Sequence, residues 1–110
     1  MYSIRQASEL AQVPASTIRY YEKIQLLPFV QRDTKGNRIF TEKEIELLNL
    51  IRCFRTLGMS IQTIQQQIQT FESQHAELNV QAILQQHKQT LVEQINLLQT
   101  YIQEIDTKIK

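Results

Sequence analysis

The sequence contains few of the residues that interrupt regular helices. Only two glycines and two prolines occur among its 110 residues, and tryptophan is absent. Glutamine, a good helix former, is abundant: the chain has 17, and 13 of them lie from Gln62 onward. Few helix-breaking residues and many helix-forming residues together predict a mainly α-helical fold.

Cysteine and long apolar runs are also scarce. Cys53 is the single cysteine, which excludes an intramolecular disulfide. No stretch approaches the roughly 18 apolar residues of a membrane span, and none has the shape of a signal peptide. We therefore expect a cytoplasmic protein without a membrane partner. The sequence also lacks an acid/base pair, a nucleophile beside a histidine, and a phosphate loop, so we expect no enzyme and no cofactor.

Charge is unevenly distributed, although the net charge is only +1. Residues 1–58 carry nine Lys/Arg and six Asp/Glu, a balance of +3. Residues 59–110 carry three Lys/Arg and five Asp/Glu, a balance of −2. The basic share therefore lies at the front of the chain, in an asymmetry too small to decide function alone.

Two short helices are predicted at the start of the chain. From Ser3 to Gln12 the apolar residues share one helical face, and Ser3 is a suitable N-cap. Pro14 breaks this pattern, since proline is tolerated only at a helix start. A second helix then runs from about Pro14 to Ile24. Two short helices joined by a tight turn indicate a helix-turn-helix, with Gln12 where glycine is often found.

The next segment, FVQRDTKGNRIF, predicts a small β-hairpin with DTKGN as its turn. Its arms are Phe29-Val30 and Arg38-Ile39-Phe40, and its basic residues are Arg32, Lys35 and Arg38.

Two longer helices should follow the hairpin. The TEKE motif matches a capping box, with Thr41 as N-cap and Glu44 as its partner. This helix should end at about Leu57, before Gly58, and its broad apolar arc predicts a central core helix. Ser60 should cap the next helix, whose apolar stripe is Ile61, Ile64, Ile68 and Phe71.

A last helix is predicted from about Asn79. Its apolar residues step alternately by four and three, as in a coiled-coil seam with one polar position at Lys88. The helix would be roughly 45 Å long at 1.5 Å per residue, too long to lay its narrow stripe on one small domain. We therefore expect an antiparallel homodimer, although packing within one chain is the alternative. The expected interface residues are Leu84, Leu91, Ile95, Leu98, Ile102, Ile105 and Ile109.

One face of the second helix is suited to DNA. Ser16, Arg19, Tyr20 and Lys23 follow the spacing of a single helical face. Arginine can pair with guanine, and serine, tyrosine and lysine can reach phosphates, sugars or base edges. The alternative is a solvated amphipathic helix. The basic hairpin nearby favours DNA, because a recognition helix and a wing together span a groove and its flanking backbone.

The segments STIRYYEKIQLLP and RDTKGNRIFTEKEIELLNLIRCFRTLGMSIQTI resemble the N-terminal domain of the MerR family of transcription regulators. The resemblance covers roughly residues 2–72, and the following helix also fits. It implies a mainly α protein: a winged helix-turn-helix DNA-binding domain over residues 1–72, a linker over 73–78, and a long antiparallel coiled-coil dimerisation helix over 79–110.

The resemblance also implies roles for individual residues. Ser16, Thr17, Arg19 and Tyr20 match the recognition helix in the major groove, and Tyr21 matches the second, partly inward tyrosine. Arg32, Lys35, Asn37 and Arg38 match the wing, while Arg55 and the Gly58–Ser60 elbow match a second wing that can meet a phosphate. Two positions depart from the family pattern: Pro14 replaces the usual serine or threonine cap, and Asn37 replaces a tyrosine.

The mechanism implied by the resemblance is deformation of a promoter. A homodimer binds a pseudo-palindrome between two polymerase-recognition elements that are spaced too far apart. On receipt of a signal it bends and untwists the DNA, so that the elements realign. RNA polymerase is then a partner only indirectly, through double-stranded promoter DNA.

The residues do not identify the effector to which such a regulator would respond. No cysteine follows Cys53, and His75 and His87 without a cysteine partner make a poor soft-metal site, so no metal is expected. Cys53 is either an inert buried side chain or a sensor of electrophiles or redox stress. The resemblance favours the sensor, since one lone-cysteine subgroup of the family is associated with aldehyde, nitric-oxide and related stress. Two other classes remain as alternatives to the regulator: a DNA-architectural, excisionase-like protein and a coiled-coil interaction module without DNA.

Overall fold

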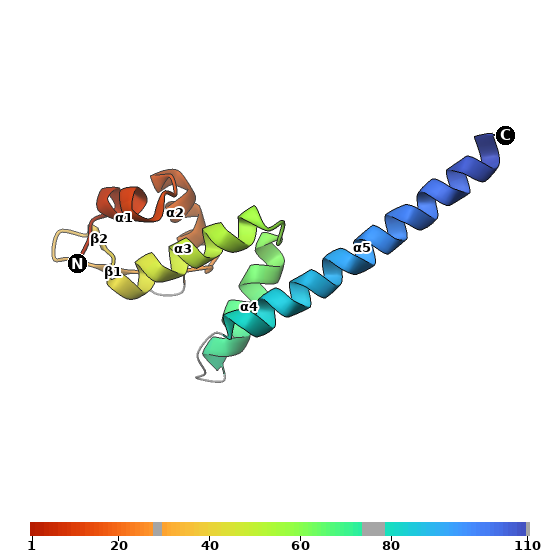
Figure 1. The fold of residues 1–110 in the computed structure, drawn as a ribbon. Coiled ribbons are helices and arrows are strands. Elements are labelled where there is room, and N and C mark those ends of the chain that lie inside the picture. The colour runs from red at the N-terminus through yellow and green to blue at the C-terminus, as the bar shows by residue number, and fades with distance from the viewer. Residues whose placement is uncertain (28–29, 74–78, 110) are drawn as a thin grey trace. The chain divides into compact units, whose positions relative to one another are not determined.

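A computed structural model describes residues 1–27, 30–73 and 79–109, and the side chains of residues 71–73 are not among those described. The chain forms two compact units, Met1–Ala76 and Glu77–Lys110. The first contains α1, α2, a two-stranded hairpin, α3 and α4, and the second contains α5 (Figure 1). Most of the expected linker, with His75, lies outside the described residues.

Helices α1 (Ile4–Ala11) and α2 (Ala15–Lys23) form the expected helix-turn-helix. Ser3 caps α1 in a full capping box with Gln6, which satisfies two backbone N–H groups at the helix start. Gln12 adopts the left-handed conformation, with φ 56°, at the position where glycine is more usual. The Ser8 hydroxyl donates to the Val13 carbonyl at 2.6 Å and braces the turn.

The hairpin is shorter than its sequence suggested. Strands β1 (Gln31–Arg32) and β2 (Arg38–Ile39) pair antiparallel, with Gln31 opposite Ile39 and Arg32 opposite Arg38. Of the expected arms, Phe29 lies outside the described residues, Val30 precedes β1, and Phe40 follows β2. Phe40 instead exchanges two backbone hydrogen bonds of 2.8 and 2.7 Å with Tyr2, because the chain's first residues occupy the pairing edge there.

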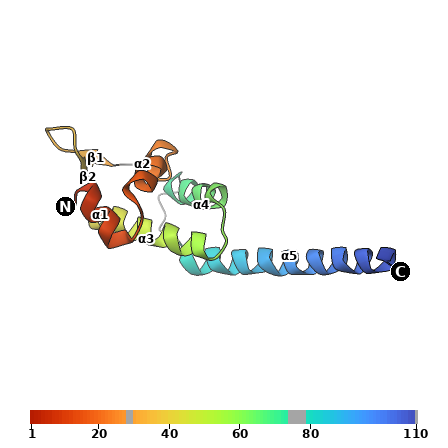
Figure 2. The same ribbon diagram turned by 90° about the horizontal axis from the view of Figure 1, so that it is seen from above.

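Helix α3 (Glu42–Thr56) begins at the predicted capping box of Thr41 and Glu44. It ends before Gly58, whose φ of +85° needs a residue without a Cβ. Helix α4 (Ile61–Ser73) starts where the Ser60 hydroxyl accepts from the Thr63 N–H at 3.1 Å. Helix α1 packs against α2 and α3, and α4 packs against α3 (Figure 2).

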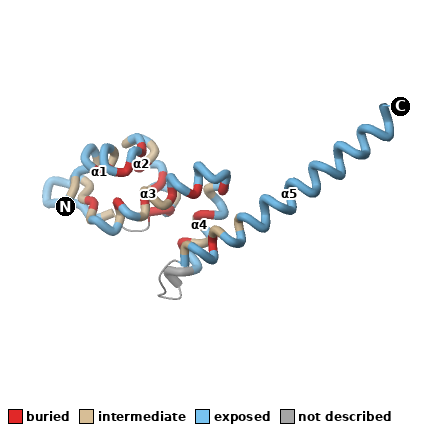
Figure 3. Tube along the Cα trace, in the orientation of Figure 1, coloured by how far each residue is buried: buried red, intermediate tan, exposed pale blue. Residues whose placement is uncertain are grey.

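The core of the first unit is apolar and is drawn from every helix in it (Figure 3). Helix α3 supplies four buried side chains, as expected of a central helix. Among the residues of this unit whose side chains the structure describes, those buried are Ala7, Ala11, Val13, Ile18, Tyr21, Leu26, Leu27, Phe40, Ile45, Leu48, Ile51, Phe54, Met59, Ile64 and Ile68.

Helix α5 (Val80–Ile109) is a single helix of 30 residues. The Asn79 side chain accepts from the Ala82 N–H at 3.0 Å and caps its start. Every described residue from Lys88 to Ile109 is exposed, including the expected seam from Leu91 onward, whereas Leu84 is half-buried (Figure 3). Val92, Leu97 and Tyr101 are exposed as well, so the apolar surface is wider than the single row that the heptad spacing predicted.

None of the described helices combines the length and hydropathy needed to cross a membrane.

Candidate nucleic-acid interface

The outward face of α2 carries the predicted row of polar and basic side chains. Ser16, Arg19, Tyr20 and Lys23 are all exposed, and Thr17 is half-buried. The same helix buries Ile18 and Tyr21 against the core, so its orientation is set by apolar contacts. Pro14 precedes α2 without a side-chain cap hydrogen bond, in place of the serine or threonine common in the resembling family.

The two neighbouring tyrosines of α2 have different environments. Tyr20 is 53% exposed and Tyr21 is 7% exposed, with their ring centroids 6.3 Å apart. Burial raises the pKa of the Tyr21 phenol, and Tyr20 raises it further, whereas the charge of Arg55 opposes the rise. Tyr21 is therefore part of the core, and Tyr20 is the tyrosine presented at the surface.

The hairpin turn is organised by one carboxylate. Asp33 accepts hydrogen bonds from the backbone N–H groups of Lys35 and Asn37, both at 2.9 Å. Gly36 has a φ of +83°, which lets the chain reverse there. Lys35 and Asn37 are consequently exposed at the tip, where a wing would meet the DNA backbone.

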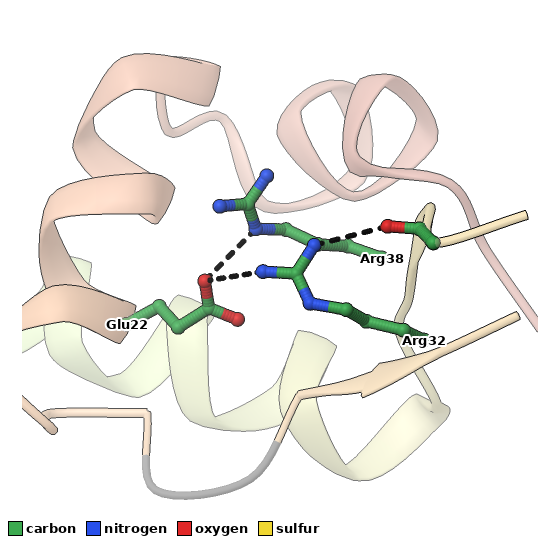
Figure 4. Close-up of polar contacts among 4 residues, drawn as sticks. Glu22, Arg32 and Arg38 are labelled. Carbon is green, nitrogen blue, oxygen red and sulfur yellow. Dashed lines mark hydrogen bonds and ion pairs between the residues drawn. The ribbon is translucent and has the colours of Figure 1, made fainter.

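Glu22 joins α2 to the hairpin, and this link was not foreseen from the sequence (Figure 4). Its Oε1 accepts from Arg38 Nε at 2.9 Å and pairs with Arg32 Nη2 at 3.5 Å. Arg32 also donates through Nη1 to the Gly36 carbonyl at 3.0 Å. Both arginines were expected as DNA contacts, but in this structure each is held by Glu22.

The position of Glu22 in the sequence was one indication that its side chain could contact a neighbouring element. It is the single acidic residue of α2, and it follows the outward Arg19 by three positions and the buried Ile18 by four. Such a residue lies on the border between the two faces of the helix. Its partners could not be known, because they come from a hairpin some ten to sixteen residues away.

Arg55 holds the elbow between α3 and α4, a role that was not predicted from the sequence. Arg55 Nη1 donates to the Met59 carbonyl at 2.9 Å, across Gly58. The Ser60 hydroxyl is engaged with Thr63 as the cap of α4. Arg55 and Ser60 are both exposed, so their predicted contact with phosphate stays a prediction.

Cys53 is exposed, so the expectation of a buried side chain is wrong for the single chain, and the choice between an inert and a sensing thiol stays a prediction. The core covers only part of α3's apolar arc: Ile51 and Phe54 are buried, whereas Leu57, one turn beyond Cys53, is 45% exposed. Among the described residues no three His, Cys, Asp or Glu side chains are placed to hold a metal ion, and His75 is outside them.

The helix-turn-helix with its hairpin defines the class of the protein as a winged helix-turn-helix, and two family models agree. Residues 2–70 match the MerR HTH family regulatory protein, and residues 45–108 match the MerR DNA-binding description. The chain belongs to the MerR family of helix-turn-helix regulatory proteins.

A curated relative from Haemophilus influenzae, described as an HTH-type transcriptional regulator, is 43% identical over 63 residues. The match covers 57% of this chain and 47% of the relative, so it spans about half of the relative's length.

Two solved structures share the fold over nearly the whole chain. One is HiNmlR, a MerR family regulator lacking the sensor domain, bound to promoter DNA. It is 30% identical, has a TM-score of 0.68, and covers 92% of this chain and 77% of its own. The other is the N-terminus of the Bacillus subtilis multidrug transporter activator, 25% identical with a TM-score of 0.76, covering 99% and 98%.

Proposed function

We propose that this protein is a sequence-specific DNA-binding transcription regulator whose recognition helix is α2. The observation that carries the proposal is the exposed row Ser16, Arg19, Tyr20 and Lys23, set on a helix whose opposite face is buried. A rigid helix with this face can enter a major groove, where arginine reads guanine edges. The relative solved on promoter DNA supports the same role for this chain.

The active species is proposed to be a homodimer formed through α5. Its seam side chains, from Leu91 to Ile109, are between 38% and 73% exposed in the single chain. Such a contiguous apolar surface on a monomer is unusual and marks an association site. The a/d spacing favours a second copy of the same helix, antiparallel, with Leu84 and Leu91 near one end.

Two recognition helices on one rigid dimer would then address two half-sites of a pseudo-palindrome. Regulation follows if the dimer holds these half-sites at a geometry that relaxed DNA does not have, because the DNA must bend and untwist to fit. RNA polymerase is affected through the promoter alone. A cytoplasmic location and the absence of cofactor and metal belong to the same proposal.

The test is binding of the purified chain to a duplex selected by the protein from a random pool, compared with a scrambled duplex. We expect specific binding that weakens with salt, because phosphate contacts release counterions. Arg19→Ala should weaken specific binding by about 1–3 kcal/mol, the usual value of a good bidentate base contact.

Arg5→Ala is the matched control, since Arg5 is also an exposed arginine and its partner is Glu9 on α1. It should bind within about twofold of the native chain, as surface changes away from an interface usually do. Equal binding to selected and scrambled DNA would favour an architectural protein, and failure to enrich any DNA would favour a coiled-coil module.

We propose that Cys53 makes the regulator responsive to electrophiles. Its exposure supports this, because a sensor thiol must be reachable by its reagent. Cys53→Ala should abolish induction of a reporter by a small aldehyde while leaving DNA binding unchanged. Native induction by the variant would remove the role of Cys53 but not the role in DNA binding.

A further inference from the structure

We propose that Glu22 is a specificity-determining residue: it positions Arg32 and Arg38 and so suppresses binding to DNA of the wrong sequence. This inference rests on the proposed function of α2 and the hairpin. The starting point is that one carboxylate oxygen serves two guanidinium groups, at 2.9 Å from Arg38 Nε and 3.5 Å from Arg32 Nη2 (Figure 4).

The three side chains are unequally exposed. Those of Glu22 and Arg38 are 22% and 24% exposed, whereas that of Arg32 is 48% exposed. A half-buried, charge-assisted hydrogen bond is screened much less by salt than an exposed ion pair. The bond between Glu22 and Arg38 therefore persists at the salt concentrations where DNA binding takes place.

Among the described residues, Glu22 makes the hydrogen bonds that join α2 to the hairpin strands. The chain leaves α2 at Lys23 and returns as β1 at Gln31, and the hairpin itself pairs only two residues on each strand. Glu22 ties the end of the recognition helix directly to β2 through Arg38. Helix α2 and the hairpin are thus held at one separation. The DNA groove that receives α2 and the DNA backbone beside it must match that separation.

Glu22 also limits the charge available for indiscriminate binding. Residues 15–39 carry five Lys/Arg (Arg19, Lys23, Arg32, Lys35, Arg38) and two acids, Glu22 and Asp33, for a balance of +3. Asp33 is engaged with backbone N–H groups of the turn. Binding to any sequence depends on how many cations can reach phosphates. Because the Glu22 carboxylate is paired with Arg32 and Arg38, fewer of the five cations are available to phosphates. The same carboxylate repels phosphates that approach out of register.

The experiment compares Glu22→Gln with Glu9→Gln in the full chain. Both changes turn a carboxylate into an amide of the same size and raise the net charge equally. Glu9 is exposed and pairs with Arg5 in a simple surface i,i+4 arrangement. Dissociation constants are measured over a salt series on the selected duplex and on the scrambled duplex, with thermal melting as a check of folding.

For Glu22→Gln, the preference for the selected duplex should fall by about tenfold, the cost of about one lost contact. Scrambled DNA should bind more tightly, with a salt slope steeper by about one unit, because a freed guanidinium reaches a phosphate. Glu9→Gln should keep the native preference. A Glu22→Gln protein with the native preference and native salt slope would overturn the inference.

Glu22→Asp separates position from charge, because it keeps the carboxylate but shortens its reach. It should weaken binding to the selected duplex and leave scrambled binding at the native level. A purely structural role predicts instead that both affinities fall together with the folded fraction. If Glu22→Gln does not fold, Glu22→Asp decides alone, and native affinity for the selected duplex then overturns the inference. A native chain that shows no preference at all refutes the proposed function rather than the role of Glu22.

Discussion

The two units of the chain treat their apolar side chains in opposite ways. Residues of the first unit bury a connected set of aliphatic and aromatic groups, including Phe40, Leu48 and Phe54. From Lys88 onward, every described residue of α5 is exposed, although this stretch holds leucines and isoleucines at regular spacing. A compact unit can cover its own stripe, whereas one straight helix has no second surface with which to do so.

Regular spacing of apolar residues therefore has two structural consequences in this chain. In α3 it marks the face that packs inside the chain, and in α5 it marks a face available to another chain. The apolar face of α3 is buried because other elements of the same unit pack against it, whereas no described element of its own unit packs against α5. The types of apolar residue in the two helices do not explain the difference.

Leu98→Asp should have the largest effect, because it places a charge in the proposed seam. Leu98 is 58% exposed in the single chain, so the aspartate harms association and not the fold of the protomer. We expect a monomer in sedimentation equilibrium at micromolar concentration, and a loss of at least about 100-fold in affinity for a two-half-site operator, since one recognition helix would bind without the other.

Asn96→Asp is the control for that change, because Asn96 is an exposed polar residue two positions away on α5. It should remain dimeric. A Leu98→Asp protein that stays dimeric at native affinity would show that α5 does not hold two copies together.

Leu48→Ala and Leu57→Ala make the same change at a position inside α3 and at the residue that follows its last turn. Leu48 is fully buried, so the variant should lose about 2–5 kcal/mol of unfolding free energy, as large-to-small core changes do. Leu57 is exposed, and its variant should lose less than about 1 kcal/mol. Urea denaturation at one protein concentration measures both, and similar losses would contradict the assigned core.

Ser3→Ala tests a smaller contribution, the capping box of α1. The Ser3 hydroxyl accepts from the Gln6 N–H at 3.1 Å, and its removal should cost about 0.5–2 kcal/mol. Ser16→Ala, on the exposed face of α2, is the comparison and should leave stability within about 0.5 kcal/mol. Thermal melting distinguishes them, and an unchanged midpoint for Ser3→Ala would contradict the cap.

Tyr2→Phe should have the smallest effect and one that depends on pH. The hydrogen bond that the Tyr2 hydroxyl donates to Glu42, and the charge of that carboxylate, raise the pKa of the phenol above its ordinary value of 10.0. The stabilisation is present below pH 10 and is lost as pH rises through the higher folded-state pKa. The stability difference between native and Tyr2→Phe chains should therefore shrink above pH 10, and a difference that grows there would contradict the bond.

Much of the first unit could be predicted because its signals are local. Ser3, Thr41 and Gly58 mark helix ends through caps that involve residues within a few positions. The outward row of α2 follows from helical spacing alone. The hairpin was predicted too long, because two-residue strands leave a weak pattern and the pairing of Phe40 with Tyr2 joins distant parts of the chain.

By itself, the sequence determined the helices, their caps, the outward residues of α2 and the repeated spacing of α5, since each depends on neighbours along the chain. The tertiary structure alone decided that Glu22 holds Arg32 and Arg38, that Arg55 closes the elbow, and that Cys53 and Leu57 face outward. These depend on which distant surfaces meet, because burial and ion pairing are set by three-dimensional contact and not by separation in sequence.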